Sequence, residues 1–252
     1  MNDPGKPRVA LVTGSSRGLG RVIARRLAAD GFAVAVNGWG EADLSDAVVA
    51  EIHAGGGRAA AFLADVTDEA AVSTLVHDVV EQLGPVDVLV LNATGPQPDA
   101  PMLDVGWADH LAQLSFFVKS PVLLARAIVP GMIERGYGRI VQVDSEVTHD
   151  TPPGRSAYAT AKSAQVGLTR SWARELAPHG ITVNSVAPGF IPVERHVDVP
   201  LDERNAYQAT IPAGRMGTPD DVAQAVSFFA SEGSGFITGQ RLVVDGGRST
   251  GR

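Results

Sequence analysis

A tyrosine and a lysine four residues apart are the side chains in this sequence whose spacing most directly suggests chemistry. Tyr158 and Lys162 lie in a run of small, helix-compatible residues, Ser156–Ala164. In a helix, positions i and i+4 share one face, so the two side chains can meet. A neighbouring ammonium lowers the pKa of a phenol from about 10, and such a tyrosine exchanges protons with a substrate oxygen. An Ala-rich helix can also carry this pair without any chemical role, so the surrounding elements must decide.

A glycine-rich turn, Thr13–Gly20, is the second candidate for chemistry. It follows an apolar run and precedes a helical pattern. Glycines permit a tight turn and a close approach of the backbone, and the exposed amides at the positive end of a helix attract a phosphate group. This is the context that a dinucleotide-binding turn requires. We therefore predict that a pyrophosphate binds here, with contacts from Gly14, Ser16, Arg17, Gly18, Leu19 and Gly20.

Seven apolar runs alternate with longer helical patterns. The runs are nearly continuous, as expected for strands of a parallel sheet that are buried on both faces. This order predicts a single α/β domain over residues 1–252, with a Rossmann-type, doubly wound parallel sheet of about seven strands and helices on both faces. The expected strands are 9–13, 33–37, 59–64, 86–91, 139–144, 181–186 and 242–244, and the expected helices are 18–30, 41–55, 68–83, 107–135, 156–178 and 219–231.

Two connections are longer than the others and leave from the carboxyl ends of strands. They span residues 95–107 and 189–219, and the second includes a short helical pattern near 201–209. Ligands of doubly wound sheets bind at this edge, so we interpret both segments as substrate loops. The alternative is that they are ordinary surface excursions, which is less favoured for the second because a loop of that length is rarely without function.

Composition excludes several classes of protein. The net charge of -7 and the absence of a basic run argue against binding to nucleic acid. With no cysteine in the chain, disulfides and thiolate chemistry are excluded, and no spacing of His, Asp and Glu suggests a metal site. The first eight residues are polar, and no segment has about 18 uninterrupted apolar residues. We expect a cytoplasmic protein without membrane association.

Together, these motifs resemble the short-chain dehydrogenase/reductase family over nearly the whole chain. The resemblance rests on the Gly-xxx-Gly-x-Gly turn, the Tyr-xxx-Lys pair and further short motifs that each follow a strand. These are Asp65-Val66, Asn92-Ala93, Ser145, the run 184–189 (Asn-Ser-Val-Ala-Pro-Gly) and the closing run 239–247 (Gly-Gln-Arg-Leu-Val-Val-Asp-Gly-Gly). Within the family, the sequence is most similar to reductases related to 3-oxoacyl-carrier-protein reductase, a branch that acts on many substrates.

The resemblance implies roles for individual residues in binding a nicotinamide cofactor. Asp65 and Val66 would hold the adenine, and Asn92 and Ala93 the adjoining ribose wall. The nicotinamide face and its carboxamide would lie against Pro188, Gly189 and Ile191. Asp65 could instead cap the following helix, although Thr67 or Asp68 is better placed to do so.

The resemblance also implies a catalytic group of Ser145, Tyr158 and Lys162. Ser145 would hold the carbonyl oxygen while the cofactor delivers hydride and Tyr158 acts as general acid/base. Lys162 would lower the pKa of the phenol and bind the nicotinamide ribose. A serine at a strand end is otherwise a common turn former, but its distance of 13 residues from Tyr158 favours the catalytic interpretation.

The choice of cofactor depends on the end of the second strand. NAD-dependent relatives carry an acidic residue there that repels a 2′-phosphate, and Gly38 occupies that position in this chain. Arg17 could pair with the 2′-phosphate, or it could be a solvated turn residue. We therefore expect NADP(H) to be preferred, with NAD(H) as the alternative.

Two departures from the family pattern lie beside the cofactor. Relatives commonly carry an Asn in the helix after the fourth strand that supports a water-mediated proton path, whereas alignment with the family pattern backwards from the run 124–127 places Phe117 there. Helix-period matching suggests about three extra residues in the segment from Trp107. The fourth strand also ends in Leu91-Asn92-Ala93-Thr94 where Asn-Asn-Ala-Gly is common. Since a phenyl ring cannot hold a water, we expect Phe117 to serve packing alone.

Polar residues in the loops favour a hydroxylated or charged substrate over a long acyl chain. The alternative is that these residues are solvated or form ion pairs. They are Asp144 and Glu146 on either side of Ser145, His149, Asp150 and Arg155 in the following loop, and Arg195 and His196 in the second long connection.

The leading functional hypothesis is an oxidoreductase that interconverts a carbonyl and a secondary alcohol with NAD(P)H. The first alternative is a catalytically weak, cofactor-sensing binding protein of the same fold, which Phe117 favours and the intact Ser145, Tyr158 and Lys162 oppose. A purely structural oligomer subunit is the second alternative. Relatives usually form homotetramers, and apolar faces on the helices at 107–135 and 156–178 fit a homo-oligomer, either a tetramer or a dimer.

Overall fold

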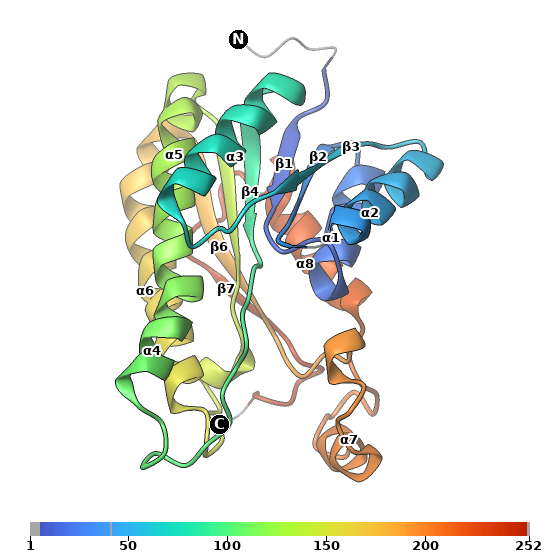
Figure 1. Ribbon diagram of the computed structural model, residues 1–252, viewed down its shortest axis with the longest axis vertical. Helices are drawn as coiled ribbons and strands as arrows, with labels where there is room; N and C mark the ends of the chain where they lie inside the picture. The colour runs from blue at the N-terminus through green and yellow to red at the C-terminus, as the bar shows by residue number, and fades with distance from the viewer. Residues whose placement is uncertain (1–5, 41, 251–252) are drawn as a thin grey trace.

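The computed structural model describes residues 6–40 and 42–250, which form a seven-stranded parallel sheet covered by helices on both faces (Figure 1). The strand order β3-β2-β1-β4-β5-β6-β7 confirms the predicted doubly wound sheet. Each predicted strand agrees with the structure to within two residues. The strands are β1 Val9–Val12, β2 Ala33–Gly38, β3 Arg58–Leu63, β4 Val86–Leu91, β5 Gly138–Val143, β6 Ile181–Pro188 and β7 Arg241–Val244.

Three helices cover each face of the sheet. Helices α1, α2 and α8 pack on one face, and α3, α5 and α6 pack on the other (Figure 1). The predicted first residue of α2, at position 41, and the polar segment 1–5 lie outside the described residues. The helices are α1 Gly18–Ala29, α2 Ala42–Ala54, α3 Glu69–Gln82, α4 Trp107–Leu114, α5 Ser120–Arg135, α6 Ser156–Leu176, α7 Leu201–Gln208 and α8 Pro219–Ala230.

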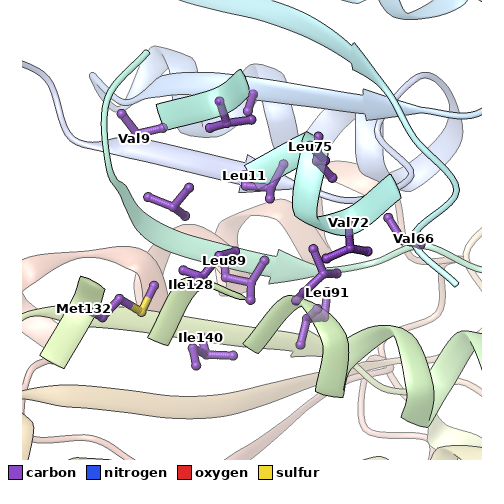
Figure 2. Close-up of a cluster of buried hydrophobic side chains, with 14 of the residues drawn as sticks. Val9, Leu11, Val66, Val72, Leu75, Leu89, Leu91, Ile128, Met132 and Ile140 are labelled. Carbon is purple, nitrogen blue, oxygen red and sulfur yellow. The ribbon is translucent and has the colours of Figure 1, made fainter. Parts of the chain in front are cut away.

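Both faces of the sheet are largely buried, which is why most residues of the strands are apolar. Alternate residues of β1 belong to different cores: Val9 and Leu11 pack with α3 and α5, whereas Ala10 and Val12 pack with α1 and α8. Figure 2 shows the first of these cores. Strand side chains on either face of the sheet therefore have apolar neighbours, as in other parallel sheets that are sandwiched by helices.

The predicted continuous helix over residues 107–135 is interrupted, which corrects that expectation. Helix α4 ends at Leu114, a π-helical turn spans Ser115–Lys119, and α5 begins at Ser120. Pro121 lacks an amide hydrogen and cannot donate to the carbonyl four residues earlier, so the ordinary helical ladder is broken here. A π-turn accommodates an extra residue, and such turns often occur at functional sites. This turn contains Phe117 and therefore determines on which side of the helix the Phe117 side chain lies.

The stretch Trp107–Arg135 would by length and composition alone suit a membrane span. Within it, Leu124, Ile128 and Met132 of α5 are buried against the sheet. A core helix of a globular domain has the same composition, and this packing accounts for the apolar character of the stretch.

Both long connections lie beyond the carboxyl ends of the strands. The segment 95–107 is largely irregular, and the segment 189–219 contains a short 3-10 helix, Glu194–His196, followed by α7. The predicted short helix near 201–209 is therefore confirmed. In Figure 1, α7 lies at the end of the molecule to which the strands point, on the same side as the loop before α4.

Candidate active site

The glycine-rich turn between β1 and α1 is built so that only glycine fits at its key positions. Gly14 has a positive φ of 62°, and a Cβ there would lie 2.8 Å from the Cα of Ala93. A Cβ on Gly20 would lie 2.3 Å from the carbonyl oxygen of Gly14. The backbone can therefore come close to a ligand and to β4 at the same time. The first amides of α1 receive no side-chain cap from Arg17, and uncapped amides at a helix start suit a pyrophosphate.

Asn92 holds this turn in place. Its Nδ2 donates hydrogen bonds to the carbonyl oxygens of Thr13 at 2.9 Å and Gly14 at 3.0 Å. These bonds join the end of β4 to the turn after β1, at the point where the strand order reverses. The side chain is thus used within the protein, and contact of Asn92 and Ala93 with the ribose remains a prediction.

The two residues predicted to hold the adenine lie directly before α3. Asp65 Oδ1 accepts from the amide of Thr67 at 2.8 Å, while the helix itself is capped by Asp68, whose carboxylate accepts from Ala71 N at 2.8 Å. Asp65 is therefore not the helix cap. The side chain of Val66 is buried in the core, so only the backbone of this residue is available to an adenine ring.

The residues predicted at the nicotinamide follow β6. Gly189 donates from its amide to the carbonyl oxygen of Val244 at 3.0 Å, and a Cβ on it would lie 2.7 Å from Tyr207 Oη. Pro188 is the last residue of β6, and the side chain of Ile191 packs in the core beneath α1 and α8. The chain from Pro188 to Ile191 is therefore closely fixed, which suits a segment that positions a cofactor ring.

Ser145 and Tyr158 are brought together as the sequence predicts. Ser145 directly follows β5, and Tyr158 lies in the first turn of α6, close enough that the Ser145 hydroxyl lowers the pKa of the Tyr158 phenol. Ser145 Oγ accepts from Val147 N at 3.3 Å, which fixes the serine side chain at the strand end. Two hydroxyls this close can both contact one substrate oxygen.

The expected lowering of the Tyr158 pKa by Lys162 is wrong for this structure. Burial of the phenol is the largest influence and raises its pKa, while the hydrogen bond from Ser145 and the charge of Arg195 oppose that effect. Lys162 Nζ lies 5.8 Å from the centre of the Tyr158 ring. Tyr158 therefore retains its proton at neutral pH, which is the form that can act as an acid.

Lys162 is buried among groups that hold its ammonium. Nζ donates to the carbonyl oxygen of Val143 at 2.7 Å and to Gln165 Oε1 at 3.0 Å. Burial lowers the pKa of Lys162 to about 7, although the charge of Asp144 partly counteracts it. Gln165 had no signal in the sequence analysis, since it lies one turn beyond Lys162 in an ordinary helical pattern.

Phe117 does more than fill space, which extends the expectation that it serves packing alone. Its ring is 1% exposed and lies 3.9 Å below Lys162 Nζ, with its edge toward the Tyr158 ring at 5.4 Å between centroids. The electron-rich face of a phenyl ring attracts a cation. Phe117 therefore stabilises the charged form of Lys162.

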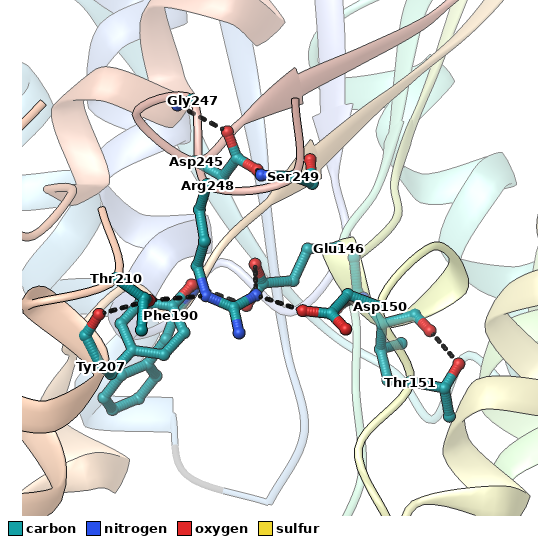
Figure 3. A network of polar contacts seen from close by, with 12 residues as sticks. Glu146, Asp150, Thr151, Phe190, Tyr207, Thr210, Asp245, Gly247, Arg248 and Ser249 are labelled. Atoms are coloured by element: carbon teal, nitrogen blue, oxygen red, sulfur yellow. Dashed lines mark hydrogen bonds and ion pairs between the residues drawn. The ribbon is translucent and has the colours of Figure 1, made fainter. Parts of the chain in front are cut away.

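The carboxylates beside Ser145 form ion pairs with arginines from the end of the chain. Asp144 Oδ2 accepts from Arg241 Nε at 2.6 Å, and Glu146 Oε2 lies 2.9 Å from Arg248 Nη1. Tyr207 of α7 donates to Glu146 Oε1 at 2.6 Å. Figure 3 shows Arg248 between Glu146 and Asp150, with Tyr207 beside it.

These pairs confirm the alternative in which loop charges are paired, and Arg155 likewise pairs with Asp99 at 3.0 Å. Sequence reasoning gave no role to Tyr207, Arg241 or Arg248. They are distant in the chain from Ser145, so no local pattern could have connected them to it.

A glycine-rich turn at the switch point of a doubly wound sheet, with Ser145, Tyr158 and Lys162 at the same edge of the sheet, is the arrangement expected of a dinucleotide-dependent oxidoreductase. A family model described as enoyl-(acyl carrier protein) reductase matches residues 14–249. The chain is 41% identical over 241 residues to the 3-oxoacyl-[acyl-carrier-protein] reductase FabG of Staphylococcus aureus, with 94% of this chain and 96% of the relative covered.

Another curated relative is the (2S)-[(R)-hydroxy(phenyl)methyl]succinyl-CoA dehydrogenase subunit BbsD of Thauera aromatica, at 38% identity with 96% of each chain covered. Among solved structures, a gluconate 5-dehydrogenase from Burkholderia cenocepacia in complex with NADP and tartrate superposes with a TM-score of 0.91 at 31% identity, covering 98% of this chain and 97% of that one.

The chain belongs to the short-chain dehydrogenase/reductase family. It is an oxidoreductase of the kind that interconverts a carbonyl and an alcohol with NAD(P)H. The reported relatives are all named as reductases or dehydrogenases, so the alternative of a cofactor-sensing binding protein receives no support from them.

Proposed function

We propose that this protein reduces a small-molecule carbonyl to a secondary alcohol with NADPH, with Tyr158 as general acid/base and Ser145 and Lys162 as its partners. The observation that carries the proposal is that Ser145 lies close to Tyr158, with the buried Lys162 Nζ 5.8 Å from the centre of the Tyr158 ring, at the same sheet edge as the glycine-rich turn. The test is NADPH oxidation across a panel of carbonyl compounds, followed by nicotinamide absorbance. The proposal would be rejected if the wild-type protein binds NADPH but reduces none of the carbonyl compounds in the panel.

Each of the three proposed catalytic residues has a separate role in the reaction. NADPH, when bound, supplies the hydride, and the alkoxide that develops on the substrate needs a proton. Ser145 donates a hydrogen bond that positions the substrate oxygen, and Tyr158 delivers its proton to that oxygen. Because burial raises the Tyr158 pKa, the phenol stays protonated until the alkoxide forms. Lys162, held by Val143 and Gln165, has its Nζ 5.8 Å from the centre of the Tyr158 ring and would bind the nicotinamide ribose.

The cofactor site supports NADP(H) over NAD(H). Gly38 ends β2, where an acidic residue would repel a 2′-phosphate, and a Cβ at this position would lie 2.3 Å from Ser45 Oγ. The gluconate 5-dehydrogenase similar to this chain was solved with NADP. The contacts proposed for the cofactor are those of the glycine-rich turn together with Asp65, Val66, Asn92 and Ala93, and with Tyr158, Lys162, Pro188, Gly189 and Ile191.

We expect kcat/KM to be at least about tenfold higher with NADPH than with NADH, which corresponds to roughly 1.4 kcal/mol from one screened charge contact. Arg17 lies at the start of α1 with an exposed side chain, so Arg17→Ala should reduce this preference while the activity with NADH is retained. Steady-state kinetics with both cofactors provides the measurement. Equal use of both cofactors by the wild type would show that the missing acid at Gly38 does not set the preference.

We further propose that the segments 95–107 and 189–219 of this single domain form the substrate-binding loops. They lie at the carboxyl edge of the sheet, and the second carries Tyr207, which contacts Glu146 next to Ser145. The substrate is a small molecule, since neither the charge of the chain nor its fold suits nucleic acid. A cytoplasmic location agrees with reduction by NADPH.

A homo-oligomer, a tetramer or a dimer, is the proposed state of the protein in solution. Apolar side chains are exposed on the edge strand β7 and near it, with Leu242 40% exposed and Phe236 fully exposed, and Trp107 and Leu111 are exposed on α4. Exposed apolar patches on such elements are typical of subunit contacts. Light scattering at micromolar concentration should give a multiple of the 26.2 kDa chain mass, and a monomeric mass would contradict the proposal.

A further inference from the structure

Arg195 lies in the short 3-10 helix Glu194–His196 of the long connection after β6. Its Nε donates to His196 Nε2 at 3.0 Å. The preceding Glu194 lies toward the glycine-rich turn instead, with Oε2 3.6 Å from the place where a Cβ of Gly18 would be. The helix therefore lies next to the start of α1, and Arg195 belongs to the wall between the cofactor cradle and α7.

Packing holds this short helix in position. The His196 ring meets the Phe190 ring edge to face at 5.0 Å, and Phe190 N donates to Tyr207 Oη at 2.7 Å. The side chain of Arg204 on α7 donates to the carbonyl oxygen of His196. Because Tyr207 also contacts Glu146, the segment that carries Arg195 is linked to the loop that follows Ser145.

The positive charge of Arg195 acts on the catalytic residues. It lowers the pKa of Tyr158 and that of Lys162, and it is carried by an exposed side chain on the segment that Tyr207 links to the loop after Ser145. Burial and the same charge lower the pKa of His196 to about 4, so this neighbour is neutral at pH 7. Arg195 is thus a cation near the reacting tyrosine. The residue to which Arg195 is hydrogen-bonded, His196, carries no negative charge.

The acids around the site are already paired with other arginines. Asp144 pairs with Arg241 at 2.6 Å, Glu146 and Asp150 pair with Arg248 at 2.9 and 3.0 Å, and Asp99 pairs with Arg155 at 3.0 Å. Within residues 6–40 and 42–250, no carboxylate lies within ion-pair distance of Arg195. Its terminal Nη groups also have no hydrogen-bond acceptor in that part of the chain, since the bond to His196 uses Nε. The remaining charge beside Tyr158 is therefore positive.

We propose that Arg195 binds an anionic group, a carboxylate or a phosphate, carried by the same small molecule whose carbonyl or hydroxyl group reacts at Tyr158. A guanidinium with Nε anchored still presents Nη hydrogens in a planar fork, which suits both kinds of oxyanion. Arg195 thereby selects anionic substrates over neutral ones of equal size. This inference rests on the proposed function, and it makes Arg195 a specificity-determining residue.

The first experiment compares a keto acid with its neutral ester. Acetoacetate and methyl acetoacetate share a carbon skeleton, and the wild type should show the higher kcat/KM for the acid. Arg195→Gln should reduce the acid-to-ester ratio of kcat/KM at least about tenfold, Arg195→Lys should keep part of it, and Arg170→Gln, which removes an exposed charge from α6, should leave it unchanged. A ratio that is unaltered in Arg195→Gln would overturn the inference.

The second experiment measures binding without turnover. Titration calorimetry on the NADP⁺-saturated protein should detect malonate or inorganic phosphate but not neutral malonamide, and Arg195→Gln should lose this anion binding at least about tenfold. Stronger binding of malonate indicates a carboxylate substrate, and stronger binding of phosphate indicates a phosphate ester. Equal binding of malonate and malonamide would overturn the inference.

The affinity for NADP⁺ provides the control for both experiments. It should be the same in Arg195→Gln and the wild type. A large loss of NADP⁺ affinity in this variant would instead assign Arg195 to the cofactor phosphates and overturn the inference. If no carbonyl compound is reduced although anions bind through Arg195, the proposed function fails while this assignment of Arg195 stands.

Discussion

Replacing Tyr158 with phenylalanine should reduce kcat at least about 100-fold, the low end of the contribution of a positioned general acid. The change removes the hydroxyl whose pKa is influenced by the nearby Ser145 and leaves the ring, which packs against Phe117, in place. The developing alkoxide then has no proton donor of suitable position. Since the glycine-rich turn is not altered, NADPH should still bind.

Tyr137→Phe is a matched control, because it removes a phenol hydroxyl from the opposite end of the sheet. Tyr137 precedes β5, its hydroxyl is buried without a hydrogen-bond partner among the described residues, and its ring lies between Arg8 and Arg139. Loss of this hydroxyl should leave kcat unchanged. Stopped-flow or steady-state assays at saturating NADPH give the comparison, and a Tyr158→Phe enzyme with wild-type turnover would remove Tyr158 from the mechanism.

Phe117→Asn should lower the free energy of unfolding by about 3 kcal/mol and should not raise kcat. The substitution removes a fully buried ring, which typically costs 3 kcal/mol or more, and it places an amide in an apolar pocket. It also removes the ring face beneath the Lys162 ammonium. Lys162 keeps its bonds to Val143 and Gln165, so its position does not depend on an amide at 117. Equilibrium unfolding in urea and kcat at saturating NADPH are the measurements.

Phe117→Leu separates packing from the interaction with the cation. Leucine retains most of the apolar contact but has no ring face, so this variant should be destabilised less than Phe117→Asn. An increase of kcat by severalfold in Phe117→Asn with an unchanged melting temperature would contradict this account. That result would mean that Phe117 interrupts a proton path which an Asn restores.

Much of the fold could be predicted from local patterns. The seven strands agree with the structure to within two residues because parallel strands with helices on both faces are rich in apolar residues along their whole length. The start of α1 at Gly18 is also local, since the turn before it needs glycines with positive φ. The break of the predicted helix 107–135 was missed because a π-turn preserves the apolar composition and changes only the hydrogen-bond pattern.

The catalytic group was partly accessible to the same reasoning. Tyr158 and Lys162 are one turn apart, and helix geometry alone places them on one face. The direction of the Tyr158 pKa shift was not accessible, because burial depends on elements that are distant in the sequence. The same holds for Lys162, whose ammonium is turned toward Val143 and the Phe117 ring.

The sequence by itself determined the order of strands and helices, the glycine-rich turn and the candidate reacting side chains, since each depends on local patterns and spacings. Only the tertiary structure decided which charged side chains at the site have an ion-pair partner. Arg241 and Arg248 form ion pairs with the acids near Ser145, which are Asp144, Glu146 and Asp150. The two arginines lie about a hundred residues later in the sequence than these acids. Arg195 keeps its charge without a carboxylate partner in the described part of the chain. Ion pairing depends on distances across the fold, which no local pattern in the sequence contains.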